Sequence, residues 1–417
     1  MWNRNFLLLW QGLFVSHVGT QLFNLALLYW VLETTGSATL MGLVLMAAAL
    51  PGALIGPFAG TLADMLNRKT LIVAADLVRG VAGLALVWAL FAASVETALV
   101  VLLASQVISG ICGAIFNPSV NAAIPDLVPA RELQRANSVL QGTNALTSTA
   151  SYGAGGFLYA LLGAPWLFLI NAISFLASAL SECFIVLEQR VSSSKVSVSA
   201  IRSRIMANTI DGLKHVWRNP GLRMLLAVLS AINFVIVPTG IALPILVRDF
   251  LHRGPEFLGV MGAFQAAGGL VGFIATGTIT IPARYRTAVV GTGLLLAAAT
   301  VVVLGFIRSP AAILMTVTAF GFLLPVINVN VISVLQGTTP SEIRGRVMGV
   351  MSTLALGLIP IAQGLSGLVI DLVDQQVPLI YKSVGLVFAV LVVGALAHRE
   401  FRAFLGTDYA SHRKHAS

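Results

Sequence analysis

Apolar stretches of about 20 residues, separated by short polar segments, run along the whole sequence and constrain its fold more than any other feature. A helix of that length is what it takes to cross the hydrocarbon core of a bilayer. Charged residues make up only 10% of the 417 residues, whereas a soluble globular domain carries about 25%. A membrane β-barrel would instead alternate apolar and polar positions. We therefore predict an all-α polytopic membrane protein.

Glycine, proline and charged residues divide the apolar stretches into twelve predicted membrane-spanning helices. The first six are predicted at residues 6–32, 40–63, 70–93, 98–123, 138–161 and 165–187. The second six are predicted at residues 222–247, 257–279, 287–307, 311–335, 347–372 and 378–397. An even number of spans puts both termini on the same side of the membrane.

The distribution of positive charge indicates which side that is. The net charge is +9, and most of the 25 Lys and Arg residues fall in the termini and in the loops on one side of the predicted membrane. Loops on the cytoplasmic side of a membrane carry such an excess. We therefore place both termini in the cytoplasm, and we expect no nucleic-acid partner, because membrane topology already accounts for the charge.

The only long polar segment divides the chain into two parts. We predict an N-terminal six-helix bundle at residues 1–187, a cytoplasmic linker at 188–221, a C-terminal six-helix bundle at 222–398 and a cytoplasmic tail at 399–417. Within the linker, Ile201, Ile205 and Leu213 recur at helical spacing opposite basic residues. This pattern predicts an amphipathic helix that lies on the inner leaflet.

The two halves of the sequence share short motifs at matching positions. The matching motifs are Gly60-Thr61 with Gly277-Thr278, 217 residues later, and Asn117 twelve residues before Pro129 with Asn328 twelve residues before Pro340. Two related six-helix halves are a common way to build a transport site near the bilayer midplane.

The loop between the second and third predicted helices carries the most specific motif, Gly60-x-Leu62-Ala63-Asp64-x-x-x-Arg68-Lys69. In this topological position the motif resembles the major facilitator superfamily, and the resemblance covers nearly the whole chain. Further motifs resemble the branch that includes macrolide efflux proteins and the enterobactin exporter: Arg4-Asn5-Phe6, Asp76-Leu77-x-Arg79, Asn117-Pro118 and Pro340-x-Glu342-x-Arg344-Gly345-Arg346. The second copy of the loop motif departs from the pattern, because Ile281 stands where the first copy has Asp64.

The resemblance implies two six-helix bundles that rock against each other in the cytoplasmic membrane of a bacterium, in a monomer surrounded by lipid. It places Asp64 near the N-terminal end of the eleventh helix, where a carboxylate meets the positive end of the helix dipole. It also brings Arg68 to Asp126, and Gly60 is expected to let the second helix approach a partner closely. The residues expected to form this conformational latch are Gly60, Asp64, Arg68, Lys69, Asp126, Glu342, Arg344 and Arg346.

Three ionisable side chains are predicted inside the membrane. Asp76 and Arg79 lie three residues apart in the third helix, where two charges are costly unless they are paired. Since the resemblance places that helix outside the cavity, we favour a structural ion pair over a role in proton coupling. His17, near mid-depth in the first helix, is a candidate for binding a substrate or a proton, and a simple hydrogen bond to a neighbour is the alternative.

Uncharged polar side chains dominate the helices that the resemblance places around and beside a central cavity. The candidate cavity residues are His17, Gln21, Asn24, Gln106, Asn117, Asn121, Gln141, Asn233, Gln265, Asn328, Asn330 and Gln363. No Asp or Glu lies at mid-depth on the cavity helices. Such a cavity suits a neutral or amphipathic organic molecule better than a polyanion or a metal cation.

The resemblance implies a secondary transporter that exports an amphipathic organic compound, such as a drug, a natural product or a siderophore, by alternating access. A flippase for lysophospholipids or similar lipids is the first alternative, because the same cavity would serve it. A membrane receptor or enzyme is the second, but the sequence has no metal-ligand cluster, nucleophile elbow or phosphate loop. We therefore expect no catalytic residues and no metal or other cofactor. The substrate, the direction of transport and any coupling to protons stay open.

Overall fold

The computed structural model describes residues 2–187, 211, 213–279, 281–340 and 343–408. These residues form helices and short turns, with no strand among them. Ten helices are long and apolar enough to cross a membrane, and two shorter apolar helical segments accompany them, Gly153–Leu162 and Ile359–Leu372. The protein is thus an all-α polytopic membrane protein, as the sequence predicts. Most of the linker, with its expected amphipathic helix, and the end of the tail lie outside the described residues.

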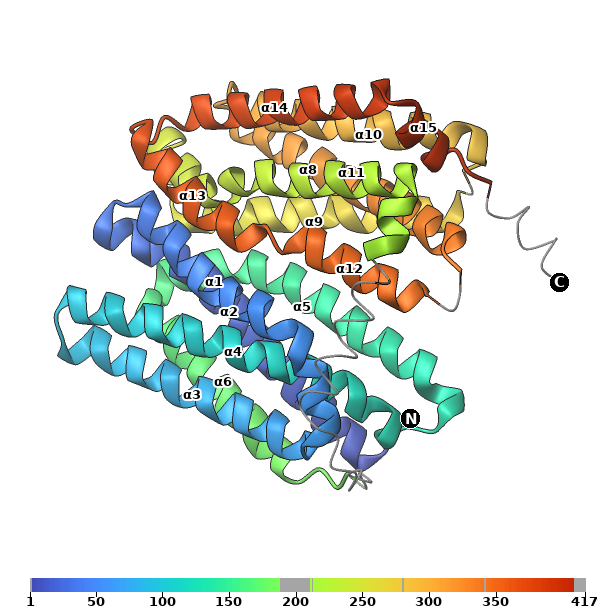
Figure 1. Ribbon diagram of the computed structural model, residues 1–417. Helices are drawn as coiled ribbons and strands as arrows, with labels where there is room; N and C mark the ends of the chain where they lie inside the picture. The colour runs from blue at the N-terminus through green and yellow to red at the C-terminus, as the bar shows by residue number, and fades with distance from the viewer. Residues whose placement is uncertain (1, 188–210, 212, 280, 341–342, 409–417) are drawn as a thin grey trace. The chain divides into compact units, whose positions relative to one another are not determined.

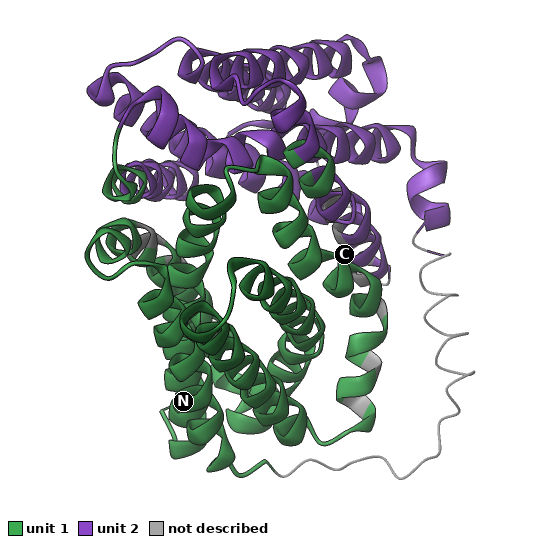
Figure 2. Cartoon of the chain, turned by 90° about the vertical axis from the view of Figure 1, so that its left-hand side faces the viewer, with its two compact units in different colours: residues 1–201, 253–260, 363–367 green, residues 202–252, 261–362, 368–417 purple. Residues whose placement is uncertain are grey.

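The chain divides into two compact units, coloured separately in Figure 2. The N-terminal unit comprises residues 1–201, 253–260 and 363–367, and the C-terminal unit comprises residues 202–252, 261–362 and 368–417. The segment 253–260 includes the start of one helix, and the segment 363–367 lies within another; the rest of both helices belongs to the C-terminal unit.

The N-terminal unit is built from the first six helices (Figure 1). They are α1 (Arg4–Thr35), α2 (Ala38–Met65), α3 (Arg68–Ala92), α4 (Val95–Leu127), α5 (Leu133–Leu162) and α6 (Ala164–Cys183), with a 3-10 turn, η1 (Ala130–Glu132), before α5. Short polar side chains at Ser37, Asn67 and Ser94 accept hydrogen bonds from the first turns of α2, α3 and α4. These caps satisfy backbone N–H groups that a helix start leaves free, and they explain why the turns are so short.

Small residues let the helices of the N-terminal unit pack closely. Helix α6 lies against both α1 and α3, while α4 lies against α2 and α3. A Cβ atom added at Gly83 of α3 would lie 2.8 Å from the Ala172 side chain of α6, and one added at Gly110 of α4 would meet the Ala48 carbonyl of α2. Helices in a membrane associate through such close contacts, because lipid tails are as apolar as the side chains and supply no hydrophobic driving force for association.

The C-terminal unit contains the corresponding helices of the second half. They are α8 (Pro220–Ile245), followed by the π turn η2 (Leu246–Phe250), α9 (Pro255–Thr278), α10 (Ala283–Leu304), α11 (Pro310–Thr338), α12 (Arg344–Leu356), α13 (Ile359–Leu372), α14 (Val377–Ala397) and α15 (Arg399–Leu405). Helix α10 packs against α11 and α14, and α8 packs against α14 and α15. A continuous apolar core joins these helices and includes Leu226, Leu294 and Phe388.

The eleventh predicted span is not the single helix that the sequence predicts at residues 347–372. It is broken into α12 and α13 at Gly357 and Leu358. Pro360 explains the break, because it has no N–H group to donate to the carbonyl four residues earlier. Glycine at position 357 also lowers the helical preference at this point.

Candidate functional site

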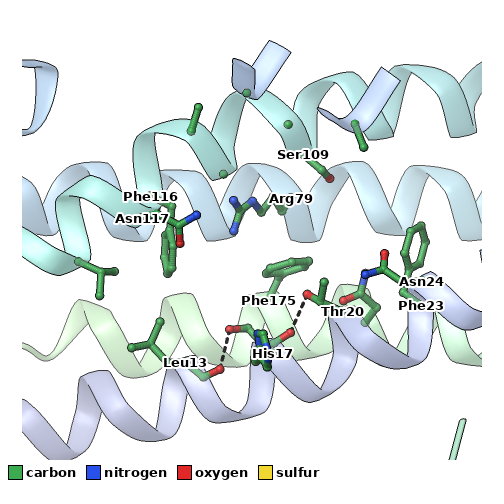
Figure 3. A pocket seen from close by; sticks show the side chains of 18 of the residues that line it. Leu13, His17, Thr20, Phe23, Asn24, Arg79, Ser109, Phe116, Asn117 and Phe175 are labelled. Carbon is green, nitrogen blue, oxygen red and sulfur yellow. Dashed lines mark hydrogen bonds between the residues drawn. The ribbon is translucent and has the colours of Figure 1, made fainter. Parts of the chain in front are cut away.

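A cavity of about 680 Å³ lies inside the N-terminal unit (Figure 3). All six helices of that unit contribute to its wall. The wall combines aromatic and aliphatic side chains with amides and hydroxyls, so it can surround an apolar body and bind its polar groups. Volumes of this order accommodate drug-sized organic molecules.

His17 lines the cavity from α1 and is tied to α5. Its Nε2 atom lies 3.3 Å from the Ser148 hydroxyl, to which the Gln21 amide also donates at 2.7 Å. Two turns closer to the start of α1, the Trp10 indole donates to the Thr143 hydroxyl of α5 at 2.9 Å. These contacts fix the spacing of α1 and α5 along one side of the cavity. They include a hydrogen bond between His17 and a neighbouring side chain, which is the alternative role that the sequence analysis leaves open for His17.

The amides that the sequence predicts on the N-terminal helices lie largely in the cavity wall. The predicted cavity residues found there are His17, Asn24, Gln106, Asn117, Asn121 and Gln141, whereas Gln21 is not among them. The sequence did not predict Thr20, Ser105, Ser109, Asn137, Asn144 or Asn171, which also line the cavity. A signal for some of them was present, because residues 137, 141 and 144 recur at helical spacing and mark one polar face of α5.

Arg79 also lines the cavity, although the resemblance places its helix outside it. This expectation is wrong for α3, which contributes Arg79, Gly83 and Leu86 to the wall. The Arg79 guanidinium lies 5.1 Å from the centre of the Phe116 ring and 5.3 Å from that of Phe175. Figure 3 labels these three side chains in the cavity wall. Aromatic faces at this distance attract a cation. Among the described residues, Arg79 is the only Lys, Arg, Asp or Glu in the wall.

Two buried carboxyl groups accompany Arg79 outside the cavity wall. Its Nη1 atom donates to Asp76 Oδ1 at 3.3 Å, which is the pair that the sequence predicts. Glu182, on α6, is fully buried as well, and its Oε1 atom accepts a hydrogen bond from the Ser178 hydroxyl at 3.3 Å. The sequence alone gives no sign that Glu182 faces this group.

The residues expected to form the latch are only partly described. Arg68 donates to Asp126 at 2.6 Å and also to the Ala122 carbonyl, as the resemblance implies for the first pair. A Cβ atom added at Gly60 would meet no described atom within 4 Å, so the expected close approach is not seen there. Glu342 and the side chains of Asp64 and Arg344 lie outside the described residues. The latch itself stays a prediction.

The remaining latch and cavity candidates lie elsewhere. Lys69 lines a small void beside Glu182, and Arg346 pairs with Asp211 at 3.2 Å within the C-terminal unit. Besides Gln21, the predicted cavity residues that are absent from the wall of this cavity are the following five: Asn233, Gln265, Asn328, Asn330 and Gln363. Four of them belong to the C-terminal unit, and Gln363 lies in one of the segments inserted into the N-terminal unit. The described residues contain no group of His, Cys, Asp and Glu side chains suited to hold a metal ion.

Known proteins resemble the chain in sequence. The Major Facilitator Superfamily profile matches residues 9–364. Macrolide efflux protein A of Streptococcus pyogenes is 26% identical over 277 residues, which cover 66% of this chain and 67% of that protein. Multidrug efflux pump Tap of Mycolicibacterium fortuitum is 28% identical over 354 residues, which cover 82% of this chain and 83% of that protein.

Solved structures share the fold. The nucleoside transporter NupG superposes with a TM-score of 0.69 at 14% identity, covering 97% of this chain and 99% of that one. A bacterial homologue of the iron transporter ferroportin in an inward-facing state superposes with a TM-score of 0.68 at 15% identity, covering 95% of this chain and 100% of that one. With a family match over most of its length and ten helices that can cross a membrane among the described residues, the chain belongs to the major facilitator superfamily of membrane transporters.

Proposed function

We propose that this protein exports an amphipathic organic compound, such as a drug or a natural product, across the bacterial cytoplasmic membrane. The observation that carries the proposal is the cavity of about 680 Å³ in the N-terminal unit, whose wall mixes aromatic rings with amides and hydroxyls. The similarity to macrolide and multidrug efflux proteins supports export as the direction.

The chemistry of the wall supports this substrate class. Phe23, Phe116 and Phe175 offer apolar surface, while Asn117 and Asn121 of α4 offer both donors and acceptors. A rigid polar group of a substrate would bind these amides, and its apolar body would displace water from the aromatic side. Because acidic side chains are missing from the described wall, the charge of a cationic substrate would have no direct partner.

Alternating access would then move the bound compound across the membrane as the two units change their relative orientation, with both termini in the cytoplasm. We propose that the protein works as a monomer in contact with membrane lipids. In this scheme the Arg68–Asp126 pair belongs to the cytoplasmic latch.

Export can be tested in a bacterial host that lacks its own efflux pumps. The host expresses the wild type, Asn121→Ala or Gln141→Ala, and the intracellular level of macrolides and of neutral and cationic dyes is measured. We expect the wild type to lower accumulation and both cavity variants to lose most of that effect. Thr292→Ala is the matched control, because Thr292 is exposed on α10 and donates only to its own helix.

A lipid flippase would give a different result in the same cells. Labelled lysophospholipid would cross the membrane of spheroplasts faster with the wild type than with Gln141→Ala, while accumulation of the other compounds would not change. That outcome would refute export of drug-like compounds.

A further inference from the structure

Three ionisable side chains meet in the interior of the N-terminal unit, and their charges do not balance. Asp76 and Glu182 are both 0% exposed, and the Arg79 side chain is 11% exposed. If both carboxyls were ionised, this buried group would carry a net charge of −1. An uncompensated charge in a membrane interior is costly, so ionisable side chains there are paired or neutral.

The carboxyl oxygens of the group lack some of the hydrogen-bond donors that they could accept from, and one added proton would supply a donor. Asp76 Oδ2 and Glu182 Oε2 are buried and have no hydrogen-bond partner among the described residues. Ser178 donates to Glu182 at 3.3 Å and also interacts with Asp76. A hydroxyl has one proton, so it can donate to only one of two carboxylates. The second contact becomes favourable when one carboxyl is itself protonated and donates.

Among the described residues of α1 and α4, no second cation contacts the group. On α1, Gly12 covers the group so closely that an added Cβ atom would lie 2.9 Å from Ser178 Oγ. His17 of the same helix contacts Ser148 instead. Cys112 of α4 is buried beside Arg79. Its protonated thiol carries no charge, so it cannot balance the carboxylates.

Lys69, on α3, and Glu182 both line a small void whose other lining residues are apolar. No ion pair joins Lys69 to Glu182 among the described residues. The single positive charge of Arg79 therefore has to balance two buried carboxyl groups.

We propose that Asp76, Ser178 and Glu182 form a binding site for one exchangeable proton, located behind Arg79 on the wall of the cavity. With that proton bound, one carboxyl is neutral, the other pairs with Arg79, and the buried group has no net charge. Without it, the two carboxylates share one guanidinium and one hydroxyl donor.

Arg79 links this proton to whatever occupies the cavity. Its guanidinium both donates to Asp76 and lines the cavity, and its Nε atom has no partner among the described residues. An acceptor group on a bound compound would compete with Asp76 for the guanidinium, so binding would favour protonation of the carboxyls. By linkage, protonation would in turn favour binding of that compound. Only this last consequence rests on the proposed transport function; the proton site does not.

Infrared spectroscopy of the purified full-length protein tests the site without any substrate. A protonated carboxyl gives a C=O stretching band that shifts when H₂O is replaced by D₂O. At neutral pH we expect such a band in the wild type and its loss in both Glu182→Gln and Asp76→Asn, because each variant leaves one carboxyl to one arginine. Glu96→Gln, at an exposed position in the first turn of α4, is the control and should keep the band.

A band that survives either substitution would overturn the proposal. If neither variant folds, Ser178→Ala is measured instead, because it removes only the bridging hydroxyl. We expect this substitution to shift the band. An unshifted band would also overturn the proposed proton site. The result is independent of the export assay. Loss of the band together with failed export would leave the proton site standing and refute the proposed function.

Discussion

The two units have corresponding helices but differ in what their interiors contain. In the N-terminal unit, Asp76, Glu182, Gln106 and Asn171 are buried, and a polar cavity opens between the helices. In the C-terminal unit, a large apolar cluster fills the interior. The buried polar side chains described there are limited to Arg286, Asn330 and Thr339, and Asn330 donates to the Val326 carbonyl of its own helix.

One close glycine-to-backbone contact between helices in the N-terminal unit has a counterpart in the C-terminal unit. Gly110 of α4 lies against the Ala48 carbonyl of α2, and Gly268 of α9 lies against the Thr318 carbonyl of α11. The matching motifs of the two halves lie 217 residues apart. At that spacing, by contrast, Gly293 and Leu296 occupy the positions that correspond to Asp76 and Arg79. Small residues at helix crossings therefore preserve the fold, while the polar chemistry can be concentrated in one half.

The largest effect is expected from Arg79→Ala. It leaves Asp76 and Glu182 buried without a cation, and removing one partner of a buried ion pair typically costs about 3–5 kcal/mol. Thermal unfolding should show a large loss of stability that becomes smaller at acid pH, where the carboxyls are neutral. Leu296→Ala, at the corresponding exposed position of α10, should change stability little. Equal losses in both variants would mean that the two interiors do not differ as described.

A smaller effect is expected from Gly113→Ala. The new methyl group would lie 2.8 Å from Arg79 Nη2, so the guanidinium must shift, and crowding of this kind costs about 1–3 kcal/mol. The control is Gly52→Ala in the same wall, whose methyl group would meet only the Gly110 carbonyl at 3.7 Å. Thermal unfolding and compound binding should both separate the two variants. Identical behaviour would show that the position of Arg79 does not matter to the cavity.

Asn117 and Asn328 occupy matching positions in the two halves and provide a direct test of the comparison. Asn117 lines the cavity, whereas Asn328 does not. Losing one hydrogen bond to a compound costs about 1 kcal/mol, or roughly a fivefold weaker affinity. We therefore expect Asn117→Ala to weaken binding in a thermal-shift titration and Asn328→Ala to leave it unchanged. Weakening by both would show that the C-terminal unit also contacts the compound.

The smallest effects on stability are expected from two ion pairs that solvent reaches, one chosen from each unit. Arg68→Gln breaks the pair with Asp126, and Arg346→Gln breaks the pair with Asp211. Pairs that solvent reaches contribute below about 1 kcal/mol, so both unfolding temperatures should stay near that of the wild type. If Arg68 belongs to a latch, transport should fall in Arg68→Gln despite the unchanged stability. Normal transport in that variant would remove Arg68 from the latch.

The sequence predicts the helices well because apolar length and punctuation determine where a chain can cross a membrane. The span predicted at 6–32 is α1 (Arg4–Thr35), and capping residues such as Asn67 set the starts of helices directly. The break between α12 and α13 was missed, since a proline and a glycine inside an apolar stretch are often tolerated in membrane helices.

The candidate site was predicted less completely than the helices. Residue type identified amides such as Asn117 and Gln106, but the rotation of each helix decides which side chains face inward. Arg79 and Glu182 show the difficulty, because their partners lie on other helices and sequence spacing reveals only the local pair with Asp76. Tertiary contacts between α3 and α6 bring the third member of the group into place.

The proline at the second residue of α13 has a consequence for its surroundings. Pro360 leaves the Leu356 carbonyl without the donor that an unbroken helix would supply. Acyl chains offer no hydrogen bonds, so a peptide oxygen left open at that depth cannot rest against lipid tails. Water or another part of the protein must therefore cover the Leu356 carbonyl. The side of the span on which this carbonyl lies is the side turned away from the bilayer.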